Sequence, residues 1–239
     1  MKICVFGSEG RMGRLVRADA GDSVSACYDR NDFDGDSFEP LSPDVQVVID
    51  FSSPEAWKDL DRLLEGSSAA LVTGTTGLEE PQMEMLRRWS RTRAVFRASN
   101  FSFGVFVLGR LLRSAALMTG CDPDLEIVEC HHGGKVDSPS GTALTLAGIW
   151  KDLCSNSEYV FGRRGRAGPR SRGEIGIHSV RGGDVTGDHS LHLLMQGESI
   201  TLSHRATGRR TFSLGALRAA EFIAEKPPGI YSMKDLAKE

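Results

Sequence analysis

The feature that most constrains the fold is a short apolar segment near the N-terminus that runs straight into a glycine-rich turn. Residues 2–6 (KICVF) have the apolar and β-branched character of a buried strand, and three glycines follow in GSEGRMG, residues 7–13. The next residues have the spacing of an amphipathic helix, and a second apolar segment, residues 24–28, ends at Asp29. This order of strand, glycine turn, helix, strand and acid is typical of a dinucleotide-binding unit.

The chemistry of such a unit explains the residue types. Glycines let the backbone approach a pyrophosphate, and a helix N-terminus offers free N–H groups to it. Asp29 is suited to accept hydrogen bonds from an adenosine ribose, and Arg30 is either a ligand for a 2′-phosphate or a solvated surface residue. Two features depart from the motif. The spacing is GxxGxxG instead of GxGxxG, and Glu9 brings a negative charge that has to point to solvent. An ordinary strand–turn–helix remains the alternative.

Alternation of strands and helices continues through the first hundred residues. Residues 45–51 and 69–73 are apolar strand-like segments, and a helical segment spans residues 79–91. Polar turns follow the strand segments at residues 52–53, 74–76 and 99–100. This pattern predicts an α/β fold with a Rossmann-like, doubly wound parallel sheet, in which a cofactor binds beyond the carboxyl ends of the strands.

The pattern changes from about residue 100. A long apolar helix is expected over residues 103–118. Three strand-like segments then follow one another with short connections, at residues 174–180, 190–197 and 198–206. Close strands with short connections usually pair antiparallel. We therefore expect a second, C-terminal α+β domain with a mixed or antiparallel sheet.

The segment ECHHGGKVDSPSGTA, residues 129–143, carries the most chemistry. It places His131, His132 and Lys135 just before a helix that Ser140 is suited to cap. A lysine beside free helix N–H groups forms an anion site, most simply for a carboxylate, and a neighbouring histidine can deliver a proton near neutral pH. With a nicotinamide nearby, hydride and proton would add across a double bond.

Three other interpretations of this segment remain. A zinc site is disfavoured because adjacent histidines on a strand point to opposite faces, and no acid or cysteine has ligand spacing on one face. A serine nucleophile lacks the GxSxG elbow. The third is a purely structural histidine pair. His189 and His192 are interpreted as ordinary sheet residues. We expect no metal.

Charge and cysteine content exclude several classes of protein. The net charge is −3, so no basic field attracts nucleic acid or an acidic membrane. The arginine-rich residues 162–173 are interpreted as a flexible solvated loop in preference to a nucleic-acid arm. The five cysteines are scattered without a CxxC pair, which indicates neither a disulfide framework nor a thiolate zinc site and favours the cytoplasm. No apolar segment approaches the roughly 18 residues of a membrane span.

The sequence resembles the 4-hydroxy-tetrahydrodipicolinate reductase (dihydrodipicolinate reductase) family of the diaminopimelate–lysine pathway. The resemblance covers nearly the whole chain and rests on its motifs. They are GSEGRMG, DFS, GTTG, ASNFSFGV, ECHHGGKVDSPSGTA, EIGIHSVRGGDVTGDH and TFSLGALRAA. It implies a dinucleotide-binding domain of residues 1–101 and 213–239, with residues 102–212 as the substrate and oligomerisation domain. It further implies a cytoplasmic homotetramer that uses NADH, NADPH or both.

The resemblance also implies roles for individual residues. Catalysis would fall to His131 as the proton donor with Lys135 as its partner. The substrate, a cyclic dicarboxylate, would contact His132, Lys135, Ser140, Gly141 and Thr142. Cofactor contacts would come from Gly7, Ser8, Glu9, Gly10, Arg11, Met12, Asp29, Arg30, Gly74, Thr75, Thr76, Ala98, Ser99, Asn100 and Phe101. Dual cofactor use is expected, with NADH favoured because a carboxylate at Asp29 repels a 2′-phosphate.

Two rival functions follow from the same residues. One is another nicotinamide-dependent oxidoreductase of similar build that acts on a different small acid. The other is a nucleotide-sensing module without catalysis, which would need neither His131 nor Lys135.

Overall fold

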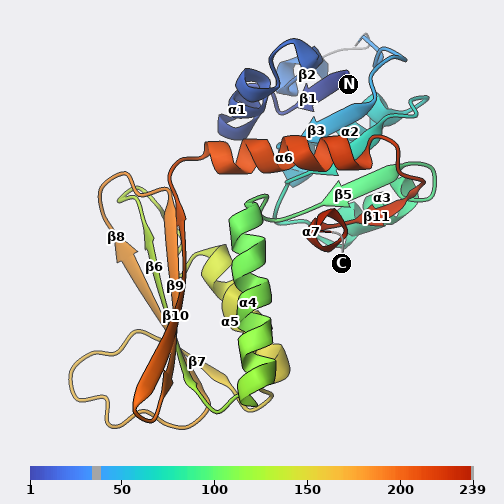
Figure 1. Ribbon diagram of the computed structural model, residues 1–239. Helices are drawn as coiled ribbons and strands as arrows, with labels where there is room; N and C mark the ends of the chain where they lie inside the picture. Colours follow the sequence, from blue (N-terminus) through green and yellow to red (C-terminus); the bar gives the residue numbers. More distant parts are fainter. Residues whose placement is uncertain (34–38, 238–239) are drawn as a thin grey trace. The chain divides into compact units, whose positions relative to one another are not determined.

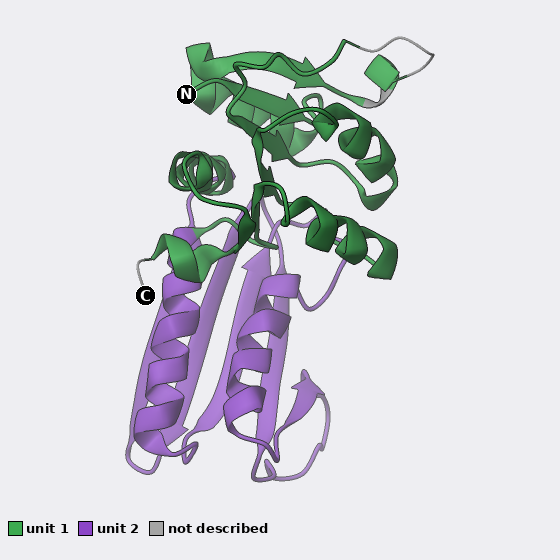
Figure 2. Ribbon diagram, turned by 90° about the vertical axis from the view of Figure 1, so that its right-hand side faces the viewer, with its two compact units in different colours: residues 1–102, 210–239 green, residues 103–209 purple. Residues whose placement is uncertain are grey.

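The computed structural model describes residues 1–33 and 39–237, and at Arg30 it describes the backbone alone. The chain divides into two compact units (Figure 2). Unit 1 consists of Met1–Ser102 and Arg210–Glu239, and unit 2 consists of Phe103–Arg209. The C-terminal segment therefore returns to the N-terminal unit.

Unit 1 contains a sheet of six strands, all paired in parallel (Figure 1). The strands are β1 (Ile3–Phe6), β2 (Val24–Tyr28), β3 (Val47–Asp50), β4 (Ala70–Thr73), β5 (Ala94–Arg97) and β11 (Gly229–Tyr231), in the order β11-β5-β4-β3-β1-β2. The central strands β1 and β3 are buried along their whole length, as expected for a sheet covered on both faces. The predicted parallel α/β sheet is confirmed.

Helices cover both faces of this sheet. Helix α6 (Arg210–Ile223) packs against α1 (Arg11–Ala20) and strands β3, β4 and β5. On the other face, the apolar sides of α2 (Trp57–Leu64) and α3 (Glu80–Trp89) pack on the strands, and their two tryptophan rings lie 5.1 Å apart. The described part of unit 1 also contains four short helical segments: η1 (Gly21–Ser23), η2 (Arg30–Phe33), η3 (Pro54–Ala56) and α7 (Met233–Leu236).

Unit 2 is a mixed five-stranded sheet with two helices, α4 (Phe103–Thr119) and α5 (Gly141–Leu153). Its strands are β6 (Asp124–His131), β7 (Glu158–Phe161), β8 (Glu174–Arg181), β9 (Gly187–Met195) and β10 (Glu198–Ala206), in the order β10-β9-β6-β8-β7. Strand β6 alternates strictly between half-buried and buried residues, so one of its faces packs on the helices. This architecture confirms the predicted α+β unit.

The expected pairing of the later strands is only partly correct. Strands β9 and β10 form the predicted antiparallel hairpin, but β8 pairs in parallel with β6 and β7 and does not touch β9. The reason is that β6 inserts between β8 and β9. Residues 182–186 then cross the end of β6, where the Gly182 N–H donates to the His131 carbonyl at 3.0 Å. The short connection between β8 and β9 therefore joins two strands that are not neighbours in the sheet.

Two further expectations need correction. Cys121 and Cys154 form a disulfide between the ends of α4 and α5, with their Cα atoms 5.9 Å apart, although their 33-residue separation gave no sign of a pair. The arginine-rich segment is anchored to the sheet, because Arg163 and Arg170 both bind Glu126, at 3.0 and 3.1 Å. Within the described residues, no helix is long and apolar enough to cross a membrane.

Candidate active site

The glycine turn after β1 forms a close contact between the turn and α1. Gly7 adopts a left-handed φ of +77°. A Cβ atom on Gly13 would lie 2.1 Å from the Gly7 carbonyl oxygen, so only glycine permits this approach. Gly10 occupies the N-cap position of α1 and has no side chain to cap it. The first N–H groups of α1 therefore face a cradle that suits a pyrophosphate.

A cleft of about 510 Å³ lies beside this turn. Gly7, Gly10 and Asp29 line it, as predicted for cofactor-binding residues. The sequence did not predict most of the other lining residues, among them Asn31 and Phe33, which follow β2 in the chain. The far wall of the cleft is formed by residues that follow β3, of which the sequence analysis singled out only the polar turn at residues 52–53. These wall residues are Phe51, Ser52, Ser53, Glu55, Ala56 and Asp59.

The charge of Glu9 is directed away from the cradle. Its carboxylate pairs with Arg14, at 3.2 Å, and with Arg17, both on the exposed side of α1. Its backbone N–H donates to the Asp29 carboxylate at 2.8 Å, which fixes the acid at the end of β2. The requirement that Glu9 point outward is met. Of the other turn residues predicted to contact cofactor, Ser8 is buried, Arg11 is exposed and Met12 is half-buried, and the Arg30 side chain lies outside the described residues.

The turn after β4 is organised by Asp50, a fully buried carboxylate at the end of β3. Asp50 accepts hydrogen bonds from the hydroxyls of Thr73 (2.7 Å) and Thr75 (2.8 Å), and from the Trp57 ring N–H (3.2 Å). Burial raises the pKa of Asp50, and the hydrogen bonds from Ser52, Thr73 and Thr75 act in the opposite direction. The predicted Thr75 side chain is therefore occupied with Asp50. Its neighbours in the turn, Gly74 and Thr76, are half-buried and exposed.

The segment after β5 mixes structural and accessible residues. Ala98 and Phe101 are buried, and the Phe101 ring packs on Phe51 at 5.5 Å. Ser99 is exposed, and Asn100 is half-buried with its side-chain oxygen accepting the Ser102 N–H at 2.8 Å. Neither this segment nor residues 74–76 line the cleft beside the glycine turn, although all follow strand ends on one edge of the sheet.

In unit 2, strand β6 ends on the predicted proton donor. His131 is only 8% exposed, and its Nδ1 lies 2.6 Å from the carboxylate of Glu129. Glu129 is 0% exposed, and burial disfavours its charged form. Hydrogen bonds from Arg181, Ser179, His131 and the Ser140 N–H outweigh the burial and lower the pKa of Glu129 to about 2. The histidine therefore faces a stable anion.

Ser140 is the N-cap of α5, as predicted, because its hydroxyl accepts the Ala143 N–H at 3.1 Å. The same hydroxyl lies 3.1 Å from Nε2 of His189. His189 lies in strand β9, as expected for a sheet residue, and its ring also meets that of His131 edge-on at 5.2 Å, a contact that the sequence did not predict. Burial, followed by the His131 charge, lowers the pKa of His189 to about 4. His189 is therefore neutral near pH 7.

Cationic side chains surround the loop between β6 and α5. Lys135 is mostly buried and pairs with the Asp137 carboxylate at 2.8 Å. The guanidinium of Arg209 lies 3.5 Å from Nε2 of His132, a contact that sequence reasoning missed because the two residues are 77 positions apart. Gly141 and Thr142, the remaining predicted substrate ligands, form the first turn of α5. Lys135, Arg209 and the N-terminus of α5 are therefore the groups around this loop that are suited to bind an anion.

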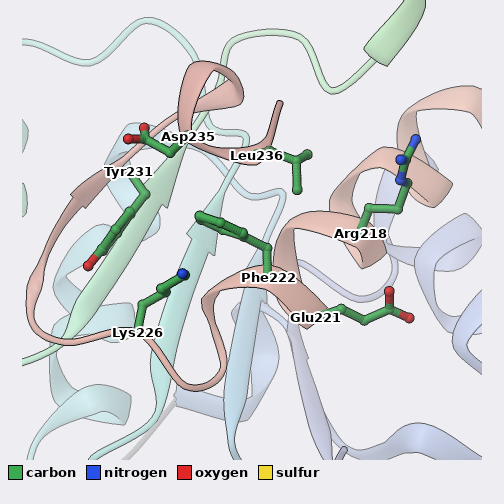
Figure 3. A pocket seen from close by; sticks show the side chains of 7 residues that line it. All are labelled: Arg218, Glu221, Phe222, Lys226, Tyr231, Asp235 and Leu236. Atoms are coloured by element: carbon green, nitrogen blue, oxygen red, sulfur yellow. The ribbon is translucent and has the colours of Figure 1, made fainter. Parts of the chain in front are cut away.

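Other parts of the described chain offer less chemistry. In the described residues, no group of three or more His, Cys, Asp or Glu side chains is arranged to hold a metal ion. A hollow of about 690 Å³ lies beside β11. Figure 3 shows Phe222 and Tyr231 in its wall, with Lys226 over the Phe222 ring. None of the predicted site residues lines this hollow.

Comparison with known proteins agrees with both halves of the chain. Residues 1–101 match the family model described as dihydrodipicolinate reductase, N-terminus, and residues 104–237 match the model for its C-terminus. A 4-hydroxy-tetrahydrodipicolinate reductase of Sulfurimonas denitrificans is 42% identical over 98% of both chains. One of Halorhodospira halophila is 38% identical, covering 98% of this chain and 97% of the other.

Solved structures show the same fold. A dipicolinate-bound dihydrodipicolinate reductase from Paenisporosarcina sp. TG-14 matches with a TM-score of 0.74 at 22% identity, over 97% of each chain. An amine dehydrogenase from Mycobacterium smegmatis matches with a TM-score of 0.58 at 11% identity, over 98% of this chain and 95% of the other. The full-length relatives and the two family models together decide the assignment. The chain belongs to the dihydrodipicolinate reductase family of oxidoreductases.

Proposed function

We propose that this chain is a 4-hydroxy-tetrahydrodipicolinate reductase of lysine and diaminopimelate biosynthesis that uses NAD(P)H. The observation that carries the proposal is the arrangement around His131. A histidine held by a buried carboxylate ends the strand just before a loop with Lys135 and the Ser140-capped N-terminus of α5. This arrangement suits the binding of a carboxylate and the delivery of a proton beside it.

Unit 1 supplies the cofactor site. NAD(P)H provides the hydride, and the uncapped start of α1 with the close Gly7–Gly13 contact suits its pyrophosphate. Asp29, held by the Glu9 N–H, is positioned to accept ribose hydroxyls. The ends of β4 and β5, residues 74–76 and 98–101, would serve the nicotinamide half. The side chains of Thr75 and Phe101 are already engaged within the unit, so we infer that backbone groups contribute most there.

Unit 2 supplies the substrate site. The substrate is a cyclic dicarboxylate, so it needs two anion ligands. Lys135 and the N-terminal turn of α5, with Ser140, Gly141 and Thr142, are suited to one carboxylate. His132 and Arg209, whose side chains lie 3.5 Å apart, are suited to the other. Lys135 would exchange Asp137 for the substrate carboxylate.

The chain's own residues then account for the proton. After loss of the 4-hydroxyl as water, a ring double bond takes hydride at one carbon and a proton at its neighbour. His131 in its imidazolium form gives the Nε2 proton to that neighbour and is left as neutral imidazole. Lys135 stabilises the negative charge that hydride addition leaves on the bound ring and so favours the hydride step. The neutral His189 places no second positive charge beside the donor.

We propose dual cofactor use with NADH preferred. The Asp29 carboxylate repels a 2′-phosphate, and Glu9 already engages Arg14 and Arg17, two cations of the following helix α1. Arg30 follows Asp29 directly and is the remaining candidate for the phosphate. Arg30→Ala should weaken NADPH binding more than NADH binding, as measured by fluorescence titration of each. Equal losses would remove Arg30 from phosphate recognition.

The assembly and location are proposed on family membership. We propose a homotetramer, and size-exclusion chromatography with light scattering tests it: a monomeric mass would contradict the proposal. We place the protein in the cytoplasm, where NAD(P)H and lysine precursors occur. The disulfide between Cys121 and Cys154 removes the cysteine-based argument for that location, so a fractionation experiment has to decide it.

The function is tested by replacing the proton donor. Aspartate semialdehyde, pyruvate and the preceding synthase generate the unstable substrate, and NADH and NADPH oxidation are followed separately. His131→Gln should reduce kcat by roughly two to four orders of magnitude, as expected for loss of a positioned general acid. NADH affinity should stay within twofold of the wild type. Wild-type turnover in this variant would overturn the role of His131, and an inactive wild type would overturn the proposed reaction.

A further inference from the structure

Glu129 is a buried carboxylate, and both of its oxygens form hydrogen bonds to charged or polar groups. Its two carboxylate oxygens accept one bond each from the Arg181 guanidinium, at 2.8 and 2.7 Å. The Ser140 N–H donates to the same carboxylate at 3.1 Å, and His131 Nδ1 lies 2.6 Å from it. A buried carboxylate with these partners stays ionised and holds one orientation.

This geometry decides which nitrogen of His131 carries out chemistry. An ionised carboxylate can only accept hydrogen bonds, so Nδ1 must carry a hydrogen toward Glu129. The exchangeable position is then Nε2. A Cβ atom at Gly187 would lie 3.0 Å from this Nε2, so a side chain at residue 187 would crowd that nitrogen.

Arg181 extends the arrangement to the lysine loop. Besides binding Glu129, its Nη2 donates to the main-chain carbonyl of Asp137 at 2.9 Å. The Asp137 side chain pairs with Lys135. One guanidinium therefore connects the partner of the proton donor with the loop that carries the proposed substrate lysine.

We propose that Glu129 and Arg181 form a positioning pair for the reaction: Glu129 fixes His131 with Nε2 toward the substrate, and Arg181 holds Glu129 and the Lys135 loop in register. This inference rests on the proposed role of His131. Neither residue touches the reacting atoms. During turnover the proton leaves Nε2 of the imidazolium, the Nδ1–H···Glu129 bond persists, and neutral imidazole remains.

The electrostatic surroundings of His131 give the pair a measurable signature. The charged or titratable groups near the ring are Glu129, Arg181 behind it, and His189 across the ring contact. Glu129 is the only anion among these three, so it stabilises the imidazolium. Removing its charge withdraws this stabilisation of the acid form.

The test uses Glu129→Gln in the full chain with NADH as the cofactor. The amide preserves the shape and removes the charge. We expect kcat to fall about 10- to 100-fold, the range for loss of a group that orients a functional histidine. KM and the Kd for NADH should stay within about twofold, in keeping with a group that never touches either ligand. The alkaline limb of the kcat–pH profile should move to lower pH.

Strand β6 provides a matched control. Glu126 lies on the opposite face of the same strand and also binds arginines and a histidine, with His178 Nε2 at 2.7 Å. Glu126→Gln removes the same charge from the same strand without facing His131. It should retain the kcat and the alkaline limb of the wild type. Equal effects of the two substitutions on kcat would overturn the positioning role.

A measurement on the wild-type protein covers the case in which Glu129→Gln fails to fold. Long-range ¹H–¹⁵N spectra of histidine-labelled protein report the tautomer of each ring, and His131→Gln assigns the His131 signals. The neutral ring should carry its hydrogen on Nδ1, and an Nε2–H tautomer would overturn the proposal. If His131→Gln is inactive while Glu129→Gln keeps wild-type kcat and pH profile, the positioning pair fails and the proposed function stands.

Discussion

The contact between Gly13 and the glycine turn allows a quantitative test of the cofactor site. A Cβ atom on Gly13 would lie 2.1 Å from the Gly7 carbonyl oxygen, about 1.3 Å closer than the 3.4 Å at which ordinary contact begins. Both partners are backbone, so Gly13→Ala must separate α1 from the turn. Overpacking of this kind costs about 1–3 kcal/mol, against which alanine gains about 0.5–1 kcal/mol in helix propensity. We expect a net loss of about 1–2 kcal/mol in the free energy of unfolding.

Cofactor binding should suffer more than stability. A displacement of about 1 Å takes a 2.9 Å hydrogen bond beyond the bonding range. Hydrogen bonds to charged groups contribute about 1.5–3 kcal/mol each, so loss of one N–H contact to the pyrophosphate weakens NADH binding roughly tenfold or more. Fluorescence titration with NADH measures the Kd, and urea unfolding followed by circular dichroism measures stability.

Gly10 supplies the comparison within the same turn. A Cβ atom there would lie 3.2 Å from the Gly7 oxygen, so Gly10→Ala requires a shift of only about 0.2 Å. Gly13→Ala should therefore weaken NADH binding more than Gly10→Ala does. If Gly13→Ala binds NADH as the wild type does, the close helix–turn contact does not shape the cofactor site.

Three further predictions concern unit 2. Lys135→Ala should raise KM for the dicarboxylate at least tenfold, because one carboxylate loses its charged partner, and steady-state kinetics with an unchanged KM would contradict this. Acidification should lower the free energy of unfolding in two ranges: below pH 6.5 toward the His189 pKa of about 4, and below pH 4.5 toward the Glu129 pKa of about 2. Both groups have a lower pKa when folded, so each favours the folded state at higher pH, and urea unfolding from pH 7 to pH 2 should show the decline. Replacing Cys121 and Cys154 by serine should lower the free energy of unfolding by about 3–4 kcal/mol relative to the oxidised wild type. The serine variant should be as stable as the wild type whose disulfide has been reduced.

Unit 1 could be predicted almost entirely because its signals are local. Each buried strand is a short apolar segment, each turn contains glycine or polar residues, and parallel strands place those turns on one edge. The sequence did not show which hydrogen bonds individual side chains form. Thr75 has the position of a cofactor ligand, but the buried Asp50 binds its hydroxyl. Asp50 comes from a different strand, and no local pattern links the two residues.

Unit 2 was less predictable because its pairing is non-local. Short connections favour hairpins, and this holds for β9 and β10 but fails for β8. Strand β6, whose Leu125 pairs with Ile175 of β8, 50 residues later in the chain, lies between β8 and β9. The same insertion brings His189 to His131 and Arg181 to Glu129. These contacts depend on sheet order, so the sequence motif points to His131 as the proposed proton donor without showing its supporting residues.

Strand β6 shows how one period-2 segment can serve two purposes. Glu126 and Glu129 are three residues apart and therefore point to opposite faces of the sheet. Glu126 binds Arg163 and Arg170 and so anchors the arginine-rich segment, which explains that segment without any nucleic-acid partner. Glu129 is enclosed on the helix-covered face and meets His131 two residues later on the same side. The imidazole is therefore held by a carboxylate two positions earlier on the same strand and, through it, by an arginine on the neighbouring parallel strand. The first relation can be recognised in the sequence, whereas the second requires the strand order.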